Sequence, residues 1–221
     1  MIAAKMAGVG RRSVPYLWVE FLAIFVAAPA GFALFQPRGL LIVGMWVLAA
    51  GALLLLLTDR SYDRRELVRV RGVKRELRRI GWMFVPLGFG MAVLMNKLMP
   101  EAVCYFPRER PVLWAAIMGL YPIFSVLPQS VIWRSFFLHR YRPLVGAGWP
   151  AVVAAAMMFG YAHVLFLNPV APALTFAGGL LLTHTHLRTR SLPIAAIEHA
   201  MYGCLAFTLG YGQFLYTGNT G

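Results

Sequence analysis

Long apolar runs that hold at most one charged residue recur along the chain, and short polar segments separate them. An α-helix rises about 1.5 Å per residue, so about 20 apolar residues cross the ~30 Å hydrocarbon core of a bilayer. Each run is about long enough for one crossing. The pattern predicts seven membrane-spanning helices, over residues 16–35, 40–57, 80–96, 111–138, 149–167, 171–187 and 192–215.

The number of crossings depends on how the uncharged stretch 143–187 is divided. Pro169 and Pro172 lie close together within it, and proline interrupts a helix because it lacks a backbone N–H. A division there gives two helices, whereas a merged or re-entrant segment gives a different total. We therefore expect an all-α, polytopic membrane helix bundle of about seven transmembrane helices (six to eight), in a single transmembrane domain over residues 1–221.

The one sizeable polar segment, residues 58–79, carries nine Lys and Arg side chains. Leu67, Val70, Val73 and Leu77 recur within it at helical spacing, with basic residues between them. This pattern is typical of a helix that lies on a membrane surface with its apolar stripe toward the lipid. We expect a basic, cytoplasmic surface helix here, which serves as a connection or, alternatively, gates the entry of substrate.

Composition and charge support an integral, multi-pass membrane protein. Of the 221 residues 60% are hydrophobic and 13% are charged, and the net charge is +13. With a cytoplasmic N-terminus, sixteen Lys and Arg fall on the inner side and four on the outer side, which agrees with the positive-inside rule. The basic excess therefore reflects topology and attraction to anionic lipid on the cytoplasmic side, and we expect no nucleic-acid partner.

Few polar residues lie inside the expected spans, and they are the candidates for function. A charge at the centre of a bilayer costs roughly 2.5–3.5 kcal/mol on insertion scales, so such residues usually face a cavity or one another. For Arg134 the alternative is that its guanidinium reaches the cytoplasmic headgroups. The polar residues are Glu20, Gln129, Ser130, Arg134, His163, Glu198 and His199.

Two of these residues, His163 and His199, are histidines on different expected helices. A neutral imidazole can take a proton from water, hold a carbonyl oxygen, bind a metal, or simply bond to a neighbouring helix. We expect no cofactor, with a metal at this histidine pair as the alternative. His184 and His186 lie beside basic residues at the end of a span, and we expect them at the interface.

The order of these residues resembles the CAAX protease and bacteriocin-processing family (CPBP/Abi) of intramembrane proteases, related to type II CAAX prenyl endopeptidases. That family shows E-E-x-x-x-R, then F-x-x-x-H, then H-x-x-x-N/D. Single motifs of this kind are weak, but three in the same order in a multi-span chain form a more specific pattern. The matching positions are Gln129, Ser130 and Arg134, then Phe159 and His163, then His199 and Gly203, with Glu198 preceding His199.

The resemblance implies an endopeptidase that hydrolyses peptide bonds near the membrane, on peptide or protein substrates that include lipidated ones. In such a site a glutamate and a histidine activate water, while the second histidine and an amide hold the oxyanion. Here Gln129 and Ser130 replace both glutamates, and Gly203 has no side-chain donor. Activity is therefore in question, and a catalytically inactive pseudoprotease that acts as a membrane binding or immunity scaffold is the alternative.

Other chemistries stay open from the residues alone. Glu198 is a candidate substitute base, although adjacent helical residues point about 100° apart and Glu198 directly precedes His199. Ser130 is a candidate nucleophile if His163 contacts it. A metal- or haem-binding protein and a transporter are further alternatives. About 15 residues of helix from Gly148 to His163 span ~22 Å, compared with ~12 Å for His199, so we expect this helix to begin above the headgroups or to tilt.

Overall fold

The computed structural model describes residues 13–36 and 39–215, and all of its regular elements are helices. The N-terminal residues 1–12, with their basic side chains, lie outside the described residues. The α-helices are α1 Val14–Phe21, α2 Ala28–Phe35, α3 Leu40–Thr58, α4 Val73–Leu98, α5 Tyr105–Glu109, α6 Pro111–Tyr121, α7 Leu127–Ser130, α8 Phe137–Arg140, α9 Arg142–Val145, α10 Trp149–Tyr161, α11 Val170–Thr189 and α12 Leu192–Leu209.

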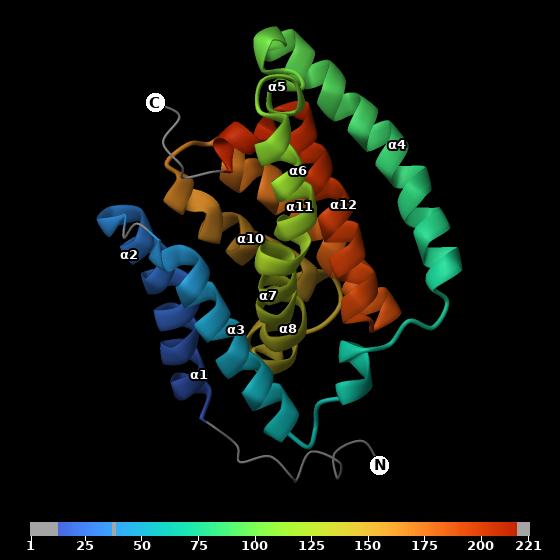
Figure 1. The fold of residues 1–221 in the computed structure, drawn as a ribbon. Coiled ribbons are helices and arrows are strands. Elements are labelled where there is room, and N and C mark those ends of the chain that lie inside the picture. Colours follow the sequence, from blue (N-terminus) through green and yellow to red (C-terminus); the bar gives the residue numbers. More distant parts are fainter. Residues whose placement is uncertain (1–12, 37–38, 216–221) are drawn as a thin grey trace.

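Six segments of the described chain are long and apolar enough to cross a membrane, which confirms the polytopic helical bundle. The seventh expected crossing corresponds to α11, which has 20 residues but includes two histidines and an arginine. Figure 1 shows α1, α4 and α12 all starting at the lower end of the bundle. The six segments are Val14–Phe35, Leu40–Thr58, Val73–Leu98, Pro111–Arg140, Trp149–Phe166 and Leu192–Leu209.

Residues 58–79 do not form the single surface helix that the sequence pattern predicts. They contain a short 3-10 turn, Arg64–Leu67, and α4 begins only at Val73. Gly72 has a left-handed conformation (φ 74°), which interrupts a right-handed helix. Tertiary contacts also fix the turn, because buried Glu66 forms an ion pair with Arg190 at the end of α11. The helical spacing of the apolar residues was therefore a misleading signal.

Two prolines make the fourth crossing, Pro111–Arg140, irregular. π-helical stretches, Pro122–Val126 and Val131–Phe136, interrupt its α-helical parts. Pro128 cannot donate a backbone hydrogen bond to the carbonyl of Phe124, one turn earlier. The indole N–H of Trp46, from α3, donates to that carbonyl instead, at 3.0 Å. A free backbone acceptor in the bundle is thus paired by a neighbouring helix, as a lipid environment requires.

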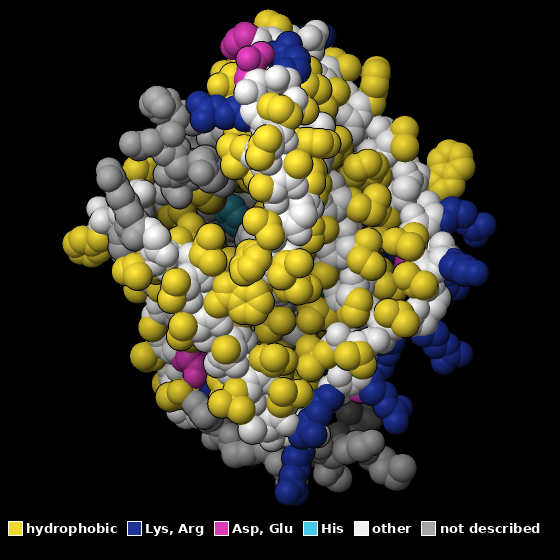
Figure 2. Space-filling model, viewed as in Figure 1, with side chains coloured by type: hydrophobic (Ala, Val, Ile, Leu, Met, Phe, Trp, Pro, Cys, Tyr) yellow, Lys and Arg dark blue, Asp and Glu magenta, His cyan; other side chains and the backbone are white. Residues whose placement is uncertain are grey.

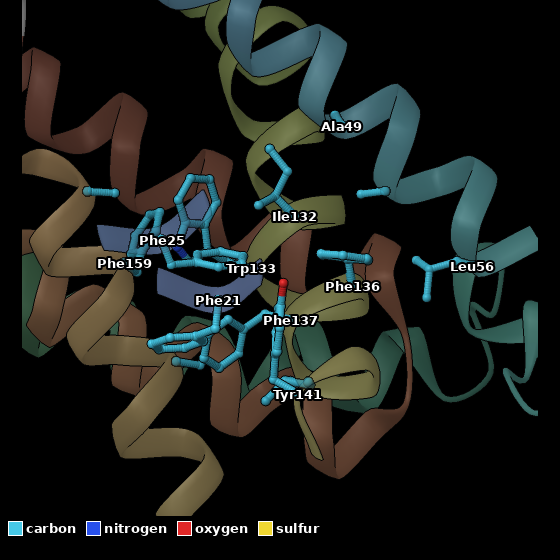
Figure 3. Packing of buried hydrophobic residues seen from close by; sticks show 14 of the residues in the cluster. Phe21, Phe25, Ala49, Leu56, Ile132, Trp133, Phe136, Phe137, Tyr141 and Phe159 are labelled. Atoms are coloured by element: carbon cyan, nitrogen blue, oxygen red, sulfur yellow. The ribbon is translucent and has the colours of Figure 1, made fainter. Parts of the chain in front are cut away.

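Aromatic side chains form the core around this irregular crossing (Figure 3). Phe25 packs edge-on against Trp133, Phe137 and Tyr141, with ring centroids 5.1 to 6.1 Å apart. Trp133 in turn lies 5.5 Å from Phe159 of α10. Such edge-to-face pairs each contribute about 0.5–1.5 kcal/mol beyond the area that they bury. The cluster therefore joins the first crossing, the fourth crossing and α10.

A largely buried ion pair links the first and fourth crossings. The guanidinium of Arg140 donates two hydrogen bonds of 2.8 Å to the carboxylate of Glu20, and the hydroxyl of Tyr141 donates a third, of 3.0 Å. A bidentate arginine with an added hydroxyl satisfies most of the carboxylate's acceptor capacity. Glu20 inside an apolar run is thereby explained as a structural residue.

α10 and α11 pack very closely, and small residues allow it. A Cβ atom at Gly179 of α11 would lie 2.9 Å from the Cα atom of Ala156, which is closer than real side chains approach. Small residues at such positions let two helix backbones approach each other within a membrane. This contact fixes α10, and with it the side chains at its C-terminal end, against the rest of the bundle.

The topology is the first testable prediction. Because basic residues concentrate in the 58–79 segment, we expect this segment in the cytoplasm and, after seven crossings, the C-terminus on the outer side. An alkaline phosphatase fused after residue 215 should be active, whereas the same enzyme inserted after residue 71 should not. The reverse pair of results would contradict the assigned orientation, and activity at neither position would contradict the count of seven.

The second prediction concerns the Glu20–Arg140 pair. Glu20→Gln should lower the free energy of unfolding by about 3–5 kcal/mol, because it leaves a buried guanidinium without its counter-charge. Thermal unfolding in detergent measures the effect. Glu109→Gln is the matched control, since Glu109 is exposed at the end of α5 and should change stability by less than about 0.5 kcal/mol. Equal midpoints for the two variants would show that the ion pair does not stabilise the bundle.

Candidate active site

Phe159 lies at the centre of the candidate site, near the C-terminal end of α10. Its ring centroid is 4.8 Å from that of His163 and 5.6 Å from that of His199 on α12. The guanidinium carbon of Arg134 lies over the same ring, 4.4 Å from its centroid. Residues from all three sequence motifs therefore meet at one aromatic side chain.

His163 is held by the helix end that precedes it. α10 tightens into a 3-10 turn, Ala162–Phe166, and Nδ1 of His163 lies 2.7 Å from the backbone carbonyl oxygen of Phe159. A carbonyl only accepts hydrogen bonds, so Nδ1 carries the hydrogen and donates. In the neutral ring, Nε2 is then the atom with the free lone pair. This tautomer suits His163 to accept a proton at Nε2.

His199 pairs with a residue outside the sequence motifs, Tyr121 at the end of α6. Its Nε2 lies 3.3 Å from the Tyr121 hydroxyl, and Nδ1 has no hydrogen-bond partner within the described chain. If Nε2 accepts the hydroxyl proton, Nδ1 carries a hydrogen that is free to donate. If Nε2 donates instead, the hydroxyl hydrogen is free. In either tautomer the pair keeps one free donor.

Gly203 makes room for Tyr121, four residues after His199 on α12. A Cβ atom at residue 203 would overlap the ring and the hydroxyl of Tyr121. The tyrosine therefore occupies the volume into which a larger side chain at residue 203 would project. Sequence reasoning missed Tyr121, and the only signal for it was the glycine at a position where the resembling family has Asn or Asp.

Arg134 does not reach the headgroups. Its side chain is only 1% exposed, in the π-helical stretch of the fourth crossing. Nη1 and Nη2 have no hydrogen-bond partner within the described chain, and no carboxylate oxygen of that part lies within ion-pair distance of Arg134. The guanidinium lies over the Phe159 ring instead, and because the side chain is buried within the protein, the headgroup alternative is wrong.

Gln129 and Ser130 lie one turn before Arg134 and carry no ionisable group. The Gln129 amide donates a hydrogen bond of 2.7 Å to the hydroxyl of Ser125, while its own carbonyl oxygen lacks a partner within the described residues. Ser130 is almost fully buried. The structure therefore keeps polar side chains where the resembling family has carboxylates, but it supplies no negative charge from them.

Glu198 lies in a different environment from the histidine beside it. It is fully buried, and neither of its carboxylate oxygens has a hydrogen-bond partner within the described residues. Its charge acts on Arg79 of α4 and on Arg188, and also on Arg134 at the Phe159 site. As a substitute base it is awkwardly oriented, because adjacent residues of a helix point about 100° apart.

The other three histidines have partners other than the Phe159 ring, and His139 pairs with Asp59 at 2.9 Å. His186 is buried inside the protein, and its Nε2 lies 3.6 Å from a carboxylate oxygen of Glu66, while its place at the membrane interface stays a prediction. His184 stacks on Trp149, with ring centroids 5.4 Å apart. Within the described residues, no group of three or more His, Cys, Asp and Glu side chains could hold a metal ion. The alternative of a metal site at His163 and His199 thus has only two nitrogen donors.

The bundle is hollowed on one face. Figure 2 shows a histidine side chain at the bottom of a hollow, with hydrophobic side chains beside it. An imidazole of this protein can therefore be approached from outside the bundle.

Residues 111–205 match the family model described as type II CAAX prenyl endopeptidase, Rce1-like. Neither a curated protein nor a solved structure matches the chain. The matched range contains both histidines of the Phe159 site, Arg134, the Gln129–Ser130 pair and Tyr121. α1 to α5, including Glu20, lie before it.

The third prediction tests the close contact of Gly203 and Tyr121. Gly203→Ala should destabilise the protein by about 1–3 kcal/mol, because the added methyl group overlaps the tyrosine ring. Gly178→Ala on α11 is the control, since its Cβ meets no atom within 4 Å and alanine favours a helix. Thermal unfolding in detergent compares them.

The same contact predicts coupling between the two residues. In a Tyr121→Ala background, Gly203→Ala should no longer destabilise the protein, because the overlapping ring is gone. A full effect of Gly203→Ala in that background would show that Tyr121 does not occupy this volume in the folded protein.

Proposed function

We propose that this chain acts on peptide segments in the membrane through its Phe159 site, because residues 111–205 match the family model of Rce1-like type II CAAX prenyl endopeptidases. The reaction that the site favours is peptide-bond hydrolysis, with His163 and His199 in the active roles. One observation carries the proposal: both imidazoles and the Arg134 guanidinium contact the same phenyl ring.

His163 would serve as the proton acceptor. Its Nδ1–H is fixed on the Phe159 carbonyl, so Nε2 is left to receive a proton from water. The water oxygen then bonds to the substrate carbonyl carbon, and the carbonyl oxygen becomes an oxyanion. The proton taken by Nε2 passes to the leaving amine as the C–N bond breaks. In these steps the atoms and protons of the hydrolysis balance with water as the only added reactant.

His199 and Tyr121 would stabilise the oxyanion. The pair keeps one free N–H or O–H donor in either tautomer, as its geometry requires. A donor that is already placed where negative charge develops is worth about 2.7–4 kcal/mol in characterised hydrolases. Gly203 has no side-chain donor, so the Tyr121 hydroxyl would take the role that the Asn side chain has at this position in the resembling family.

The missing carboxylate limits the reaction. Ser130 lies one helical turn before Arg134, whose positive charge would keep a carboxylate at residue 130 ionised. Without that group, water activation depends on His163 alone. We therefore propose that the unaltered chain hydrolyses peptides slowly, on a substrate class that includes lipidated peptides, because the site lies within the membrane-spanning bundle.

A second candidate function is peptide binding without hydrolysis. The observation that favours it is the hydrogen bond from Gln129 to Ser125. The side chain at this position, where the resembling family has a glutamate, is used for a contact within its own helix. In that case the chain is a pseudoprotease that holds a membrane peptide as a binding or immunity scaffold. The two candidates share the same site and differ in whether a bond is cleaved.

The fourth prediction separates them. Ser130→Glu should raise the rate of peptide cleavage by roughly 10²–10⁴-fold, because it restores a carboxylate beside Arg134, and His163→Ala in that background should abolish the gain. The assay uses a farnesylated peptide and a panel of membrane peptides, with cleavage read by mass spectrometry.

Ser135→Glu is the matched control, since Ser135 is equally buried in the same irregular crossing but lies outside the motif. It should give no gain in rate. If the unaltered protein already cleaves and Ser130→Glu changes nothing, the role proposed for a carboxylate at residue 130 is wrong. If folded Ser130→Glu binds the peptides and cleaves none, the scaffold function is the correct one.

A further inference from the structure

A basic cavity of about 370 Å³ lies between the first three turns of α4 and the last turn of α11, on the other side of α12 from Tyr121. It is separate from the Phe159 site, with which it shares no lining residue. The side chains around it are of two kinds, basic and apolar, with a single carboxylate. They are Arg75, Glu76, Arg78, Arg79, Trp82, Met83 and Arg188.

The charges of this basic cavity do not cancel. Arg188 holds the buried carboxylate of Glu76 with both of its terminal nitrogens, one of them at 3.0 Å. Arg79 lies 3.5 Å from the same carboxylate, and it donates a hydrogen bond of 2.7 Å to Thr185. Glu76 is thus already bound, while four arginines share its single negative charge. The side chains that line the cavity therefore carry a net charge of +3, which favours an anion.

Arg78 has no ion-pair or hydrogen-bond partner for its side chain in the described part of the chain. Arg78 is exposed and forms neither an ion pair nor a side-chain hydrogen bond there, and Arg75 touches Glu76 only at 3.5 Å with most of its side chain exposed. Exposed arginines that line a cavity and lack a carboxylate can donate to phosphate oxygens, which they recognise well. The cavity therefore offers donors beyond those that its own glutamate uses.

The apolar side of the cavity indicates what kind of anion it takes. Trp82 follows Arg78 by one turn and is 79% exposed, and Met83 lies beside it. Tryptophan with arginine at the end of a crossing is typical of the membrane interface, where headgroups and acyl chains meet. In Figure 2, Lys and Arg side chains gather along the edge that α4 forms, next to apolar ones. A ligand with an anionic head and an apolar tail fits both parts.

We propose that the basic cavity binds the phosphate group of an anionic phospholipid, with Arg75 and Arg78 as donors and Trp82 against the acyl chains. Basic cavities between membrane helices are suited to such headgroups. This site is independent of the proposed peptidase activity. A bound lipid would also connect α4, which packs mainly along α12, to the end of α11.

The test uses the full chain in phosphatidylcholine vesicles with increasing dibrominated phosphatidylglycerol. Bromine quenches nearby tryptophan fluorescence, and Trp82→Phe identifies the share that comes from Trp82. In Arg75→Gln/Arg78→Gln, the association constant for phosphatidylglycerol relative to phosphatidylcholine at Trp82 should fall about 30-fold, the equivalent of about 1 kcal/mol per arginine. Glu76 keeps Arg188 and Arg79 in this variant, so the fold should hold.

Arg64→Gln/Arg71→Gln is the matched control, because it removes the same charge from exposed residues outside the cavity. It should change the association constant by less than about threefold. An equal fall in both variants would overturn the proposal in favour of general charge attraction. Displacement of the brominated lipid by millimolar inorganic phosphate would also overturn it, because the cavity would then take free phosphate.

Discussion

The contact between Arg134 and the ring of Phe159 is the interaction on which the candidate site depends. A guanidinium within the membrane costs roughly 2.5–3.5 kcal/mol, and a cation–π contact returns about 0.5–2 kcal/mol. The contact therefore offsets part of the cost, and it does so only while α10 holds the ring in place. The same ring lies against both imidazoles, so one packing arrangement stabilises the arginine and positions the histidines.

The irregular fourth crossing makes this arrangement compatible with a membrane. Its prolines and π-helical stretches leave backbone groups that a regular helix would pair, and protein side chains must pair them. Trp46 does so at the Phe124 carbonyl, and the aromatic cluster of Phe25, Trp133 and Phe137 surrounds the stretch. Distorted backbone and unusual polar side chains thus occur in the same crossing because neighbouring helices cover both.

The sequence pattern predicted the features that depend on one segment alone, and it missed those that depend on tertiary contacts. Six of the seven expected crossings agree with the structure, because length and apolar content are properties of each segment alone. The expected helix over 58–79 does not form as one element. Gly72 has a left-handed conformation that interrupts it, and the ion pair of Glu66 with Arg190 fixes the preceding turn. The position of His163 relative to His199 likewise depends on tertiary contacts, because the tight turn after α10 and the packing of α10 on α11 place its side chain.

The sequence by itself determined the membrane-spanning character of the chain, the order of the three motifs and the absence of a carboxylate at residues 129 and 130. Residue type and spacing suffice for those features. The tertiary structure alone decided that Tyr121 fills the space beside Gly203 and reaches His199, and that Arg134 lies on Phe159 rather than at the headgroups. These contacts join residues far apart in the chain, and only the packing of whole helices brings such residues within a few ångströms of each other.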